Sequence, residues 1–223
     1  MMKDFKLIKV KEGILSENDD KASKLRQKLK NEKRFMINLM ASPGAGKTTT
    51  LLKLAEVLDK KIRLSVIEAD IDSSVDAEAV AGKDISTVQL QTGGFCHLDA
   101  EMVSGGLKEV LETDPDLIII ENVGNLVCPA EFDTGAHSNI MILSVPEGDD
   151  KPVKYPLIFS VCDLLIVNKT DMISLTDFDM EKLEQRAKKV NPKIEIISVS
   201  AKSGEGFENL KAWIESKIEK HRS

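Results

Sequence analysis

One stretch, Ala41 to Thr48, constrains the fold of this chain most strongly. It reads Ala-Ser-Pro-Gly-Ala-Gly-Lys-Thr and stands between an apolar run at 35–40 and an amphipathic run at 49–58. A strand that enters a glycine-bearing turn ending in Gly-Lys-Thr, and then opens a helix, is typical of a phosphate-binding loop. Such a loop holds phosphate oxygens with inward backbone N–H groups and with the positive end of the helix. The stretch therefore predicts a P-loop nucleotide-binding domain.

The side chains of this loop have distinct expected roles. The ammonium of Lys47 can contact the β- and γ-phosphates, and the hydroxyl of Thr48 can ligate Mg²⁺. Ala41 stands where the pattern has its first glycine, a position that tolerates alanine if the backbone needs no positive φ. The predicted phosphate-site residues are Ser42, Gly44, Ala45, Gly46, Lys47, Thr48 and Thr49.

Hydrophobic patterning predicts an α/β fold around this loop. Short runs that are apolar on both faces indicate buried strands, and they occur at 35–40, 63–68, 117–121, 140–145, 164–168 and 194–199. Helix-period stretches alternate with them at 48–59, 98–111, 181–189 and 207–219. The alternation predicts a P-loop NTPase three-layer sandwich at 35–223, with a largely parallel sheet flanked by helices. Residues 1–34 are expected to form an N-terminal helical extension, with a helix over 22–29.

Composition excludes several classes of partner. The 223 residues carry a formal net charge of −6 with a pI near 5.3, which argues against a nucleic-acid-binding surface. No apolar run is long enough to span a bilayer, and the first residues lack the apolar core of a signal peptide, so we expect a cytoplasmic location without membrane contact. Three cysteines without an export signal favour free thiols or metal ligands over disulfides.

A second motif, Asn168-Lys169-Thr170-Asp171, follows a predicted strand and matches the guanine-reading motif of GTPases. The Asp171 carboxylate can accept two hydrogen bonds from guanine that adenine cannot offer. Asn168 would tie the loop and contact the base, and the stem of Lys169 would lie along its face. The triplet Ser200-Ala201-Lys202 follows the last strand, and Ala201 would offer its N–H to the guanine oxygen. We therefore expect GTP to bind far more tightly than ATP.

Hydrolysis requires charge neutralisation and a positioned water more than a strong base. The predicted catalytic residues are Lys47, Thr48, Asp70 and Glu121, and the last three are also the candidate Mg²⁺ ligands. Asp72 and Asp76 are further candidates for organising the water. Asn125 stands near the position of the glutamine that orients water in small signalling GTPases, so we expect low intrinsic turnover.

Two further stretches carry a family resemblance. Residues 94–100 (Gly-Phe-Cys-His-Leu-Asp-Ala) and 121–130 (Glu-Asn-Val-Gly-Asn-Leu-Val-Cys-Pro-Ala), with 147–152, resemble the hydrogenase nickel-incorporation GTPases of the HypB family. The resemblance implies a metallochaperone that works with other nickel-delivery factors on the [NiFe]-hydrogenase large subunit and forms a homodimer with GTP. Residues 1–34 contain no cysteine or histidine, so any metal is expected inside the GTPase domain.

Cys96, His97 and Cys128 are the candidate ligands for that metal. Thiolates and imidazole suit Zn²⁺ or Ni²⁺ and are wrong for Mg²⁺. Three ligands leave the coordination sphere open, and a twofold dimer can complete it. The alternative is that both cysteines are small core residues and that His97 caps the following helix. Cys162 lies beside an apolar run and is expected to be buried.

Two other functions stay open at this point. A urease-type nickel accessory GTPase is similar, although the separated cysteines fit it less well than a Cys-Pro-His triplet would. A P-loop kinase for a small molecule is the other alternative, although it has no need of the guanine-reading motif.

Overall fold

The computed structural model describes residues 10–58, 60–70 and 85–223, and leaves aside the side chains of 10–14 and of Asp70. Asp72 and Asp76, expected to organise water, lie outside the described residues, as does the side chain of Asp70. Within the described ranges, no helix is long and apolar enough to cross a membrane.

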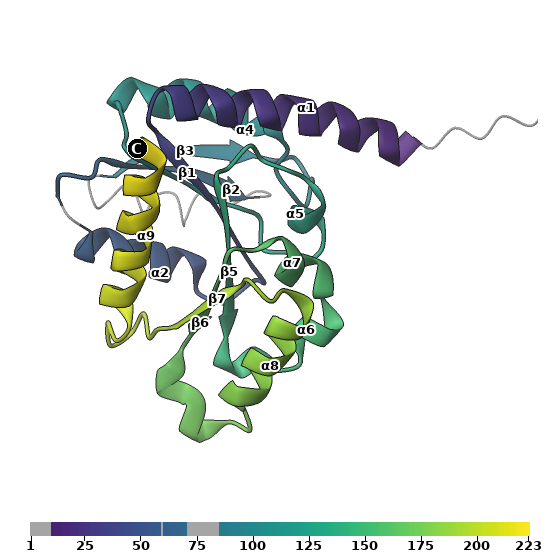
Figure 1. The fold of residues 1–223 in the computed structure, drawn as a ribbon, viewed down its shortest axis with the longest axis vertical. Coiled ribbons are helices and arrows are strands. Elements are labelled where there is room, and N and C mark those ends of the chain that lie inside the picture. The colour runs from purple at the N-terminus through teal and green to yellow at the C-terminus, as the bar shows by residue number, and fades with distance from the viewer. Residues whose placement is uncertain (1–9, 59, 71–84) are drawn as a thin grey trace, which may run out of the picture.

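A seven-stranded, all-parallel sheet forms the centre of the molecule (Figure 1). Its strands, in spatial order, are β3 (Ser86–Gln91), β2 (Leu64–Asp70), β4 (Leu117–Glu121), β1 (Phe35–Ala41), β5 (Ser138–Ser144), β6 (Leu164–Asn168) and β7 (Glu195–Ser198). The helices that cover it are α1 (Val10–Asn31), α2 (Lys47–Val57), α4 (Ala100–Val110), α5 (Cys128–Glu131), α6 (Lys151–Lys154), α7 (Pro156–Val161), α8 (Met180–Val190) and α9 (Phe207–Arg222). The predicted α/β sandwich with a parallel sheet is confirmed.

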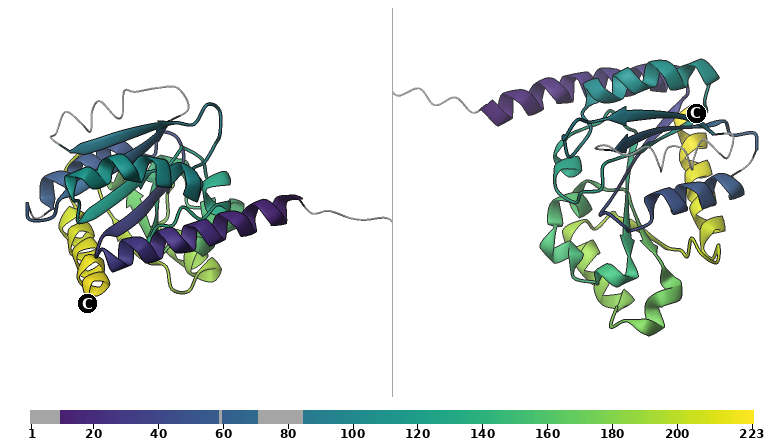
Figure 2. Two further views of the ribbon diagram at one scale, coloured as in Figure 1. Left: turned by 90° about the horizontal axis from the view of Figure 1, so that it is seen from above. Right: turned by 180° about the vertical axis from the view of Figure 1, so that it is seen from behind.

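The helices form a layer on each face of the sheet (Figures 1 and 2). On one face, α2 and α9 pack over Phe35, Ile37 and Leu39 of β1. On the other face, Met36 packs in a cluster with α1 and α4, and Met40 packs in one with α7 and α8. Successive β1 side chains thus point to opposite faces, which explains why the strand is apolar at almost every position.

The sequence analysis missed the edge strand β3 and the short helices α5, α6 and α7. Strand β3 reads Ser-Thr-Val-Gln-Leu-Gln and is only partly buried along its length. Among the described strands it pairs with β2 alone, and it lacks the continuous apolar run by which the other strands were predicted. The helices escaped prediction because each has only four to six residues, too few for a helical period to show.

Helix α1 is longer than the 22–29 helix expected from the sequence and packs on the domain. Ala22 and Leu29 are fully buried. The Asn18 side chain accepts a hydrogen bond from Ala100 N at 2.9 Å, which ties α1 to the first residue of α4. Arg26 forms an ion pair with Asp133. The N-terminal extension is therefore part of the packed core from at least Asn18 onward.

His137 lies where α1, β1 and α9 meet. Its Nδ1 accepts a hydrogen bond from Met36 N at 3.0 Å, and its Nε2 lies 3.1 Å from Arg26 O, to which it donates. Its ring lies against His221, with 4.2 Å between the centroids. Burial, with a smaller effect of His221, lowers the pKa of His137 from 6.5 to about 4. The histidine is thus a neutral structural link.

We expect His137 to make the fold sensitive to acid. Its folded-state pKa lies below its unfolded value, so the unfolded chain binds more protons as the pH falls from 6.5 to about 4, and the free energy of unfolding decreases. Because the ring is partly exposed, we expect a loss of about 1–2 kcal/mol over this window. Urea denaturation of the wild type and of His137→Gln between pH 7 and pH 4 measures it. The variant keeps a donor and an acceptor but does not titrate, so equal pH slopes for the two proteins would contradict the assignment.

Candidate functional site

The phosphate loop has the backbone geometry that its sequence predicts. It connects the end of β1 to the start of α2, and Gly44 and Gly46 both adopt left-handed φ values, 75° and 96°. A Cβ atom at Gly46 would lie 2.6 Å from Nδ2 of Asn168. Only glycine satisfies both the backbone angle and this close approach. The loop is thus packed against the segment that carries the predicted base-reading motif.

Two predicted catalytic side chains meet at the carboxyl edge of the sheet. The Thr48 hydroxyl donates a hydrogen bond of 2.7 Å to Oε1 of Glu121, the last residue of β4. Glu121 is buried, and its register neighbour on β2 is Glu68, which is also buried. A hydroxyl and carboxylates are the oxygen donors that Mg²⁺ prefers, so Thr48 and Glu121 fit the ion and would hold it.

The base-reading segment is bonded to the phosphate loop. Nδ2 of Asn168 donates to Ala45 O at 3.0 Å, and Nζ of Lys169 donates to Gly44 O at 2.7 Å. Lys169 takes a left-handed φ of 62°, which turns the chain sharply at the end of β6. Both loops are therefore held in one fixed arrangement by side chains of the same motif.

Asp171 and the Ser200-Ala201-Lys202 triplet meet beside this arrangement. Ser200 Oγ donates to Oδ1 of Asp171 at 2.6 Å. The N–H of Ala201, expected to face guanine, instead donates to Oδ1 of Asn168 at 3.2 Å, so a contact with the base would have to share or replace that bond. A hollow of about 440 Å³ lies here. Its lining residues are Thr49, Asn168, Lys169, Asp171, Met172, Leu175, Ala201 and Lys202.

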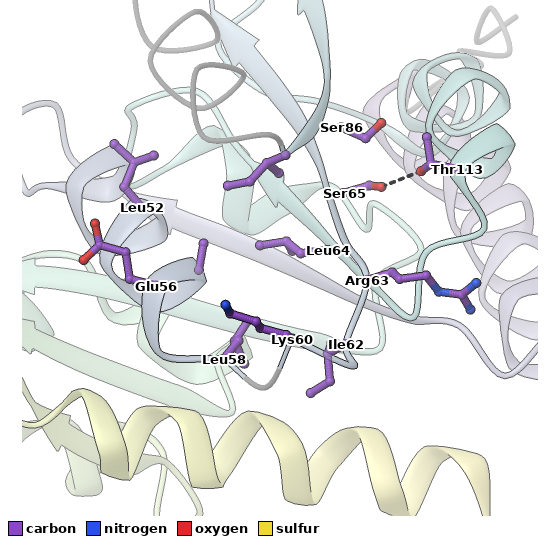
Figure 3. Close-up of a pocket in the computed structure, with 12 residues that line it drawn as sticks. Leu52, Glu56, Leu58, Lys60, Ile62, Arg63, Leu64, Ser65, Ser86 and Thr113 are labelled. Atoms are coloured by element: carbon purple, nitrogen blue, oxygen red, sulfur yellow. Dashed lines mark hydrogen bonds between the residues drawn. The ribbon is translucent and has the colours of Figure 1, made fainter.

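A larger hollow, of about 590 Å³, lies between α2 and the start of β2 (Figure 3). Half of its twelve lining residues are aliphatic and half are polar or charged, with the hydrogen-bonded pair of Ser65 and Thr113 at one side. None of the residues predicted from the sequence to bind a ligand lines it. Size alone therefore does not select the smaller hollow around Asp171, which is the one lined by residues predicted to contact the base.

Glu147 is a functional candidate that the sequence analysis missed. Its carboxylate is hydrogen-bonded to the Ser42 hydroxyl of the phosphate loop, and it also accepts from the backbone N–H of Ser144 at 2.7 Å. Glu147 thus connects the phosphate loop to the end of β5. The available signal was an acidic residue just beyond a buried strand, at the edge where the other site residues gather.

Cys96 and Cys128, far apart in the sequence, lie in contact. The interaction of its thiol with that of Cys96, followed by burial, raises the pKa of Cys128, while the Asn125 side chain lowers it. Nδ1 of His97 lies 3.9 Å from the Cys96 sulfur. The His97 ring stacks on Phe132 with 3.8 Å between centroids, and burial lowers its pKa. The three predicted metal ligands therefore gather in one place.

The side chains of Cys96, His97 and Cys128 are not arranged as a complete metal site. Among residues 10–58, 60–70 and 85–223, no group of three or more His, Cys, Asp or Glu side chains is arranged to hold a metal ion. Their donor chemistry fits Ni²⁺ or Zn²⁺, but binding requires a rearrangement or a ligand from a second subunit.

The structure does not support the alternative in which both cysteines are core residues and His97 caps the following helix. Asp99, rather than His97, caps α4 by accepting a hydrogen bond of 2.8 Å from Met102 N. Cys96 and Cys128 are only partly buried, whereas Cys162 is buried, as expected. Burial raises the pKa of the Cys162 thiol.

Asn122 connects the loop that carries Cys96 to the strands beside the phosphate loop, and the sequence analysis gave it no role. It is fully buried directly after Glu121, and its Oδ1 accepts from Leu98 N at 3.3 Å and from Val123 N at 2.9 Å. Its Nδ2 donates to Oδ1 of Asn38, in the middle of β1, at 3.0 Å. The loop that carries the candidate metal ligands is thus bonded to the strands that carry the phosphate site.

Comparison with known proteins shows the family. Residues 35–198 match the CobW/HypB/UreG nucleotide-binding domain. The hydrogenase maturation factor HypB of Azotobacter vinelandii is 44% identical over 94% of this chain and 69% of its own length. The chain belongs to the HypB family of hydrogenase maturation factors. The HypB fold is also found in the crystal structure of Helicobacter pylori HypB in complex with nickel, with a TM-score of 0.87 and 37% identity, covering 93% of this chain and 97% of that one.

Some HypB relatives carry a wider description. The protein of Helicobacter pylori strain J99, 42% identical over 97% of this chain and 90% of its own length, is named a hydrogenase/urease maturation factor. HypB proteins are thus not confined by name to one enzyme.

We expect the Asn122 side chain to be a major source of stability in this HypB fold. Asn122→Ala removes three buried hydrogen bonds and leaves their partners unsatisfied, which should lower the free energy of unfolding by about 2–4 kcal/mol. Urea denaturation measures the loss. Asn31→Ala, at the exposed end of α1, is the matched control and should cost less than about 1 kcal/mol. Equal effects of the two substitutions would contradict the role of Asn122.

Proposed function

We propose that this HypB-family chain binds and hydrolyses GTP, and that it couples this cycle to a nickel or zinc ion held by Cys96, His97 and Cys128. The observation that carries the proposal is the short segment 121–128. It begins at Glu121, which is hydrogen-bonded to Thr48 of the phosphate loop, and it ends at Cys128, whose thiol interacts with that of Cys96. A change at the phosphate site can therefore reach a metal ligand through a few residues.

Guanine selectivity rests on Asp171. Its carboxylate is exposed at the hollow and held by Ser200, ready to accept hydrogen bonds from the ring N–H and the amine of guanine. Once a base covers this carboxylate, adenine would leave it without a donor, and that penalty disfavours ATP. Asn168 and Lys169 keep the base-reading segment in register with the phosphate loop.

Hydrolysis depends on positioning the phosphates of GTP and neutralising their charge. Lys47 begins α2 and would neutralise charge on the β- and γ-phosphates, while the loop N–H groups orient them. Mg²⁺, when bound, neutralises further phosphate charge, and Thr48, Glu121 and Asp70 are its candidate ligands. The Asn125 side chain interacts with Cys128, and its Oδ1 accepts from Val127 N at 2.8 Å. Because asparagine stands here in place of a water-orienting glutamine, we expect low intrinsic turnover.

Metal binding completes the cycle. The Cys96 and Cys128 thiols interact with one another, and after losing their protons both would serve as ligands to one ion. Homodimerisation in the GTP state would bring a second set of ligands to the site, since a twofold interface repeats every group. At Gly124, a Cβ atom would lie 3.1–3.3 Å from Pro43 of the phosphate loop, so this segment lies closely against that loop and can respond to its movement.

The intended recipient is the [NiFe]-hydrogenase large subunit, reached with other nickel-delivery factors in the cytoplasm. The name of the Helicobacter pylori relative includes urease, so urease is a second candidate recipient. A small-molecule kinase is distinguished by its products, because it would consume GTP without releasing inorganic phosphate. Equal release of GDP and phosphate supports hydrolysis, whereas GDP without phosphate would overturn it.

We expect Asp171→Asn to change base specificity. The variant should lose about 100-fold or more in GDP affinity, because an amide N–H would face guanine's donors. It should gain affinity for XDP, whose base has a carbonyl where guanine has an amine. Calorimetry with both nucleotides measures the exchange. Asp177→Asn, an exposed carboxylate on the same segment, is the control and should leave both affinities unchanged; wild-type GDP affinity in Asp171→Asn would contradict the assignment.

We expect the Cys96→Ala/Cys128→Ala variant to lose stoichiometric Ni²⁺ and Zn²⁺ binding, because it removes both thiolate ligands. Metal content after gel filtration measures this loss. Cys162→Ala removes one thiol that lies in the core and should keep the wild-type stoichiometry. Unchanged metal content in the double variant would refute the site.

We expect GTP to promote dimerisation of the chain. Light scattering should give a monomer with GDP and a dimer with a slowly hydrolysed GTP analogue, each measured with and without Ni²⁺. A mass that does not change between these states would remove the dimer from the proposal.

A further inference from the structure

A hollow of about 560 Å³ lies at the opposite end of β1 from the phosphate loop. Phe35, the first residue of β1, lies at its base, and side chains of α1 and α9 form its sides. In both ribbon views the C-terminal end of α9 lies beside the junction of α1 and β1 (Figures 1 and 2). Its basic lining residues are Arg26, Lys30, His137, Lys217, Lys220 and His221.

The lining of this hollow, called the basic hollow below, is positively charged, whereas the chain as a whole carries a net negative charge. Four Lys or Arg and two His side chains line it, and among the described residues no Asp or Glu does. The chain as a whole has 37 acidic residues against 31 Lys and Arg, so composition alone does not account for this one-sided lining. A concave surface that carries one sign of charge concentrates the electric field and attracts ions of the opposite sign.

The two histidines report the positive potential. Burial is the largest cause that lowers the pKa of each, and nearby cations lower both further. Lys30 acts on both rings, Arg26 acts on His137 and Arg222 acts on His221. The cations around the basic hollow thus add to the effect of burial in disfavouring a further positive charge on either ring.

Two of the four Lys and Arg side chains that line the basic hollow already have an acidic partner. Arg26 is paired with Asp133, and Lys217 lies 3.4 Å from Glu195. Lys30 on α1 and Lys220 on α9 are exposed, and neither forms an ion pair within the part of the chain that the structure describes. These two lysines face one hollow from two different helices, so a single ligand can engage both.

We propose that the basic hollow binds a small anion that carries two or more phosphate or carboxylate groups. Lysine ammonium groups bind such oxygens as point charges and can donate up to three hydrogen bonds each. The volume is within the range of small-molecule sites. Because α1 and α9 supply the two lysines, the bound anion would join the leading helix to the C-terminal helix. The site is separate from the proposed nucleotide site, which lies at the other end of β1.

Calorimetry on the full chain preloaded with GDP tests this proposal, with inorganic pyrophosphate and tricarballylate as separate probes. Pyrophosphate tests for phosphate recognition, and tricarballylate tests for carboxylate recognition. At least one probe should bind the GDP-loaded protein, and Lys30→Gln/Lys220→Gln should weaken that binding about tenfold or more by removing both uncompensated charges. Lys24→Gln/Lys28→Gln removes the same charge from α1 outside the basic hollow and should change the affinity less than about twofold.

Two results would overturn the proposal. One is the absence of binding of both probes to the GDP-loaded wild type. The other is equal weakening by the two double variants, which would indicate attraction to the surface charge in general. A pyrophosphate signal that GDP abolishes belongs to the phosphate loop and supports that site only. Amide hydrogen exchange provides an independent readout, because the bound anion should slow exchange in α1 of the wild type and of the control variant but not in Lys30→Gln/Lys220→Gln.

Discussion

The hydrogen bonds of one buried amide, that of Asn168, hold the nucleotide edge of the molecule together. Its Nδ2 donates to Ala45 O of the phosphate loop, and its Oδ1 accepts from Ala201 N in the segment after β7. A buried amide must have its donor and acceptor satisfied, so the three segments are constrained to one geometry. This packing explains why Gly46 has no room for a side chain.

A second set of polar contacts runs through the core on one face of the sheet. Asn38 of β1 donates to Asn139 Oδ1 at 3.1 Å and accepts from Asn122, between two apolar clusters. Such a chain specifies which strands are neighbours, because any other arrangement would leave buried amides unsatisfied. Through Asn122 it also fixes the loop that carries Cys96, so stability and the candidate coupling of metal to nucleotide depend on the same contacts.

The two ends of β1 have different characters. The carboxyl end, as in other parallel α/β sheets, gathers the phosphate loop, the buried carboxylates and the paired thiols. The amino end gathers basic side chains of α1 and α9, together with His137, which directly precedes β5. Helix α1 supplies Arg26 and Lys30 to the second group, so the segment that precedes the nucleotide-binding domain helps to build a separate, positively charged surface.

The sequence by itself determined the parallel α/β class, the phosphate loop and the base-reading motif, because each depends on a local pattern of residues. It also indicated Cys96, His97 and Cys128 by their chemistry and by family resemblance. Only the tertiary structure decided which distant residues meet: β4 lies beside β1, so Glu121 reaches Thr48, and Cys96 meets Cys128. The edge strand β3, the role of Glu147 and the basic hollow were likewise hidden. Contacts between segments far apart in the chain leave no local period or spacing, so they exist only once the fold has formed.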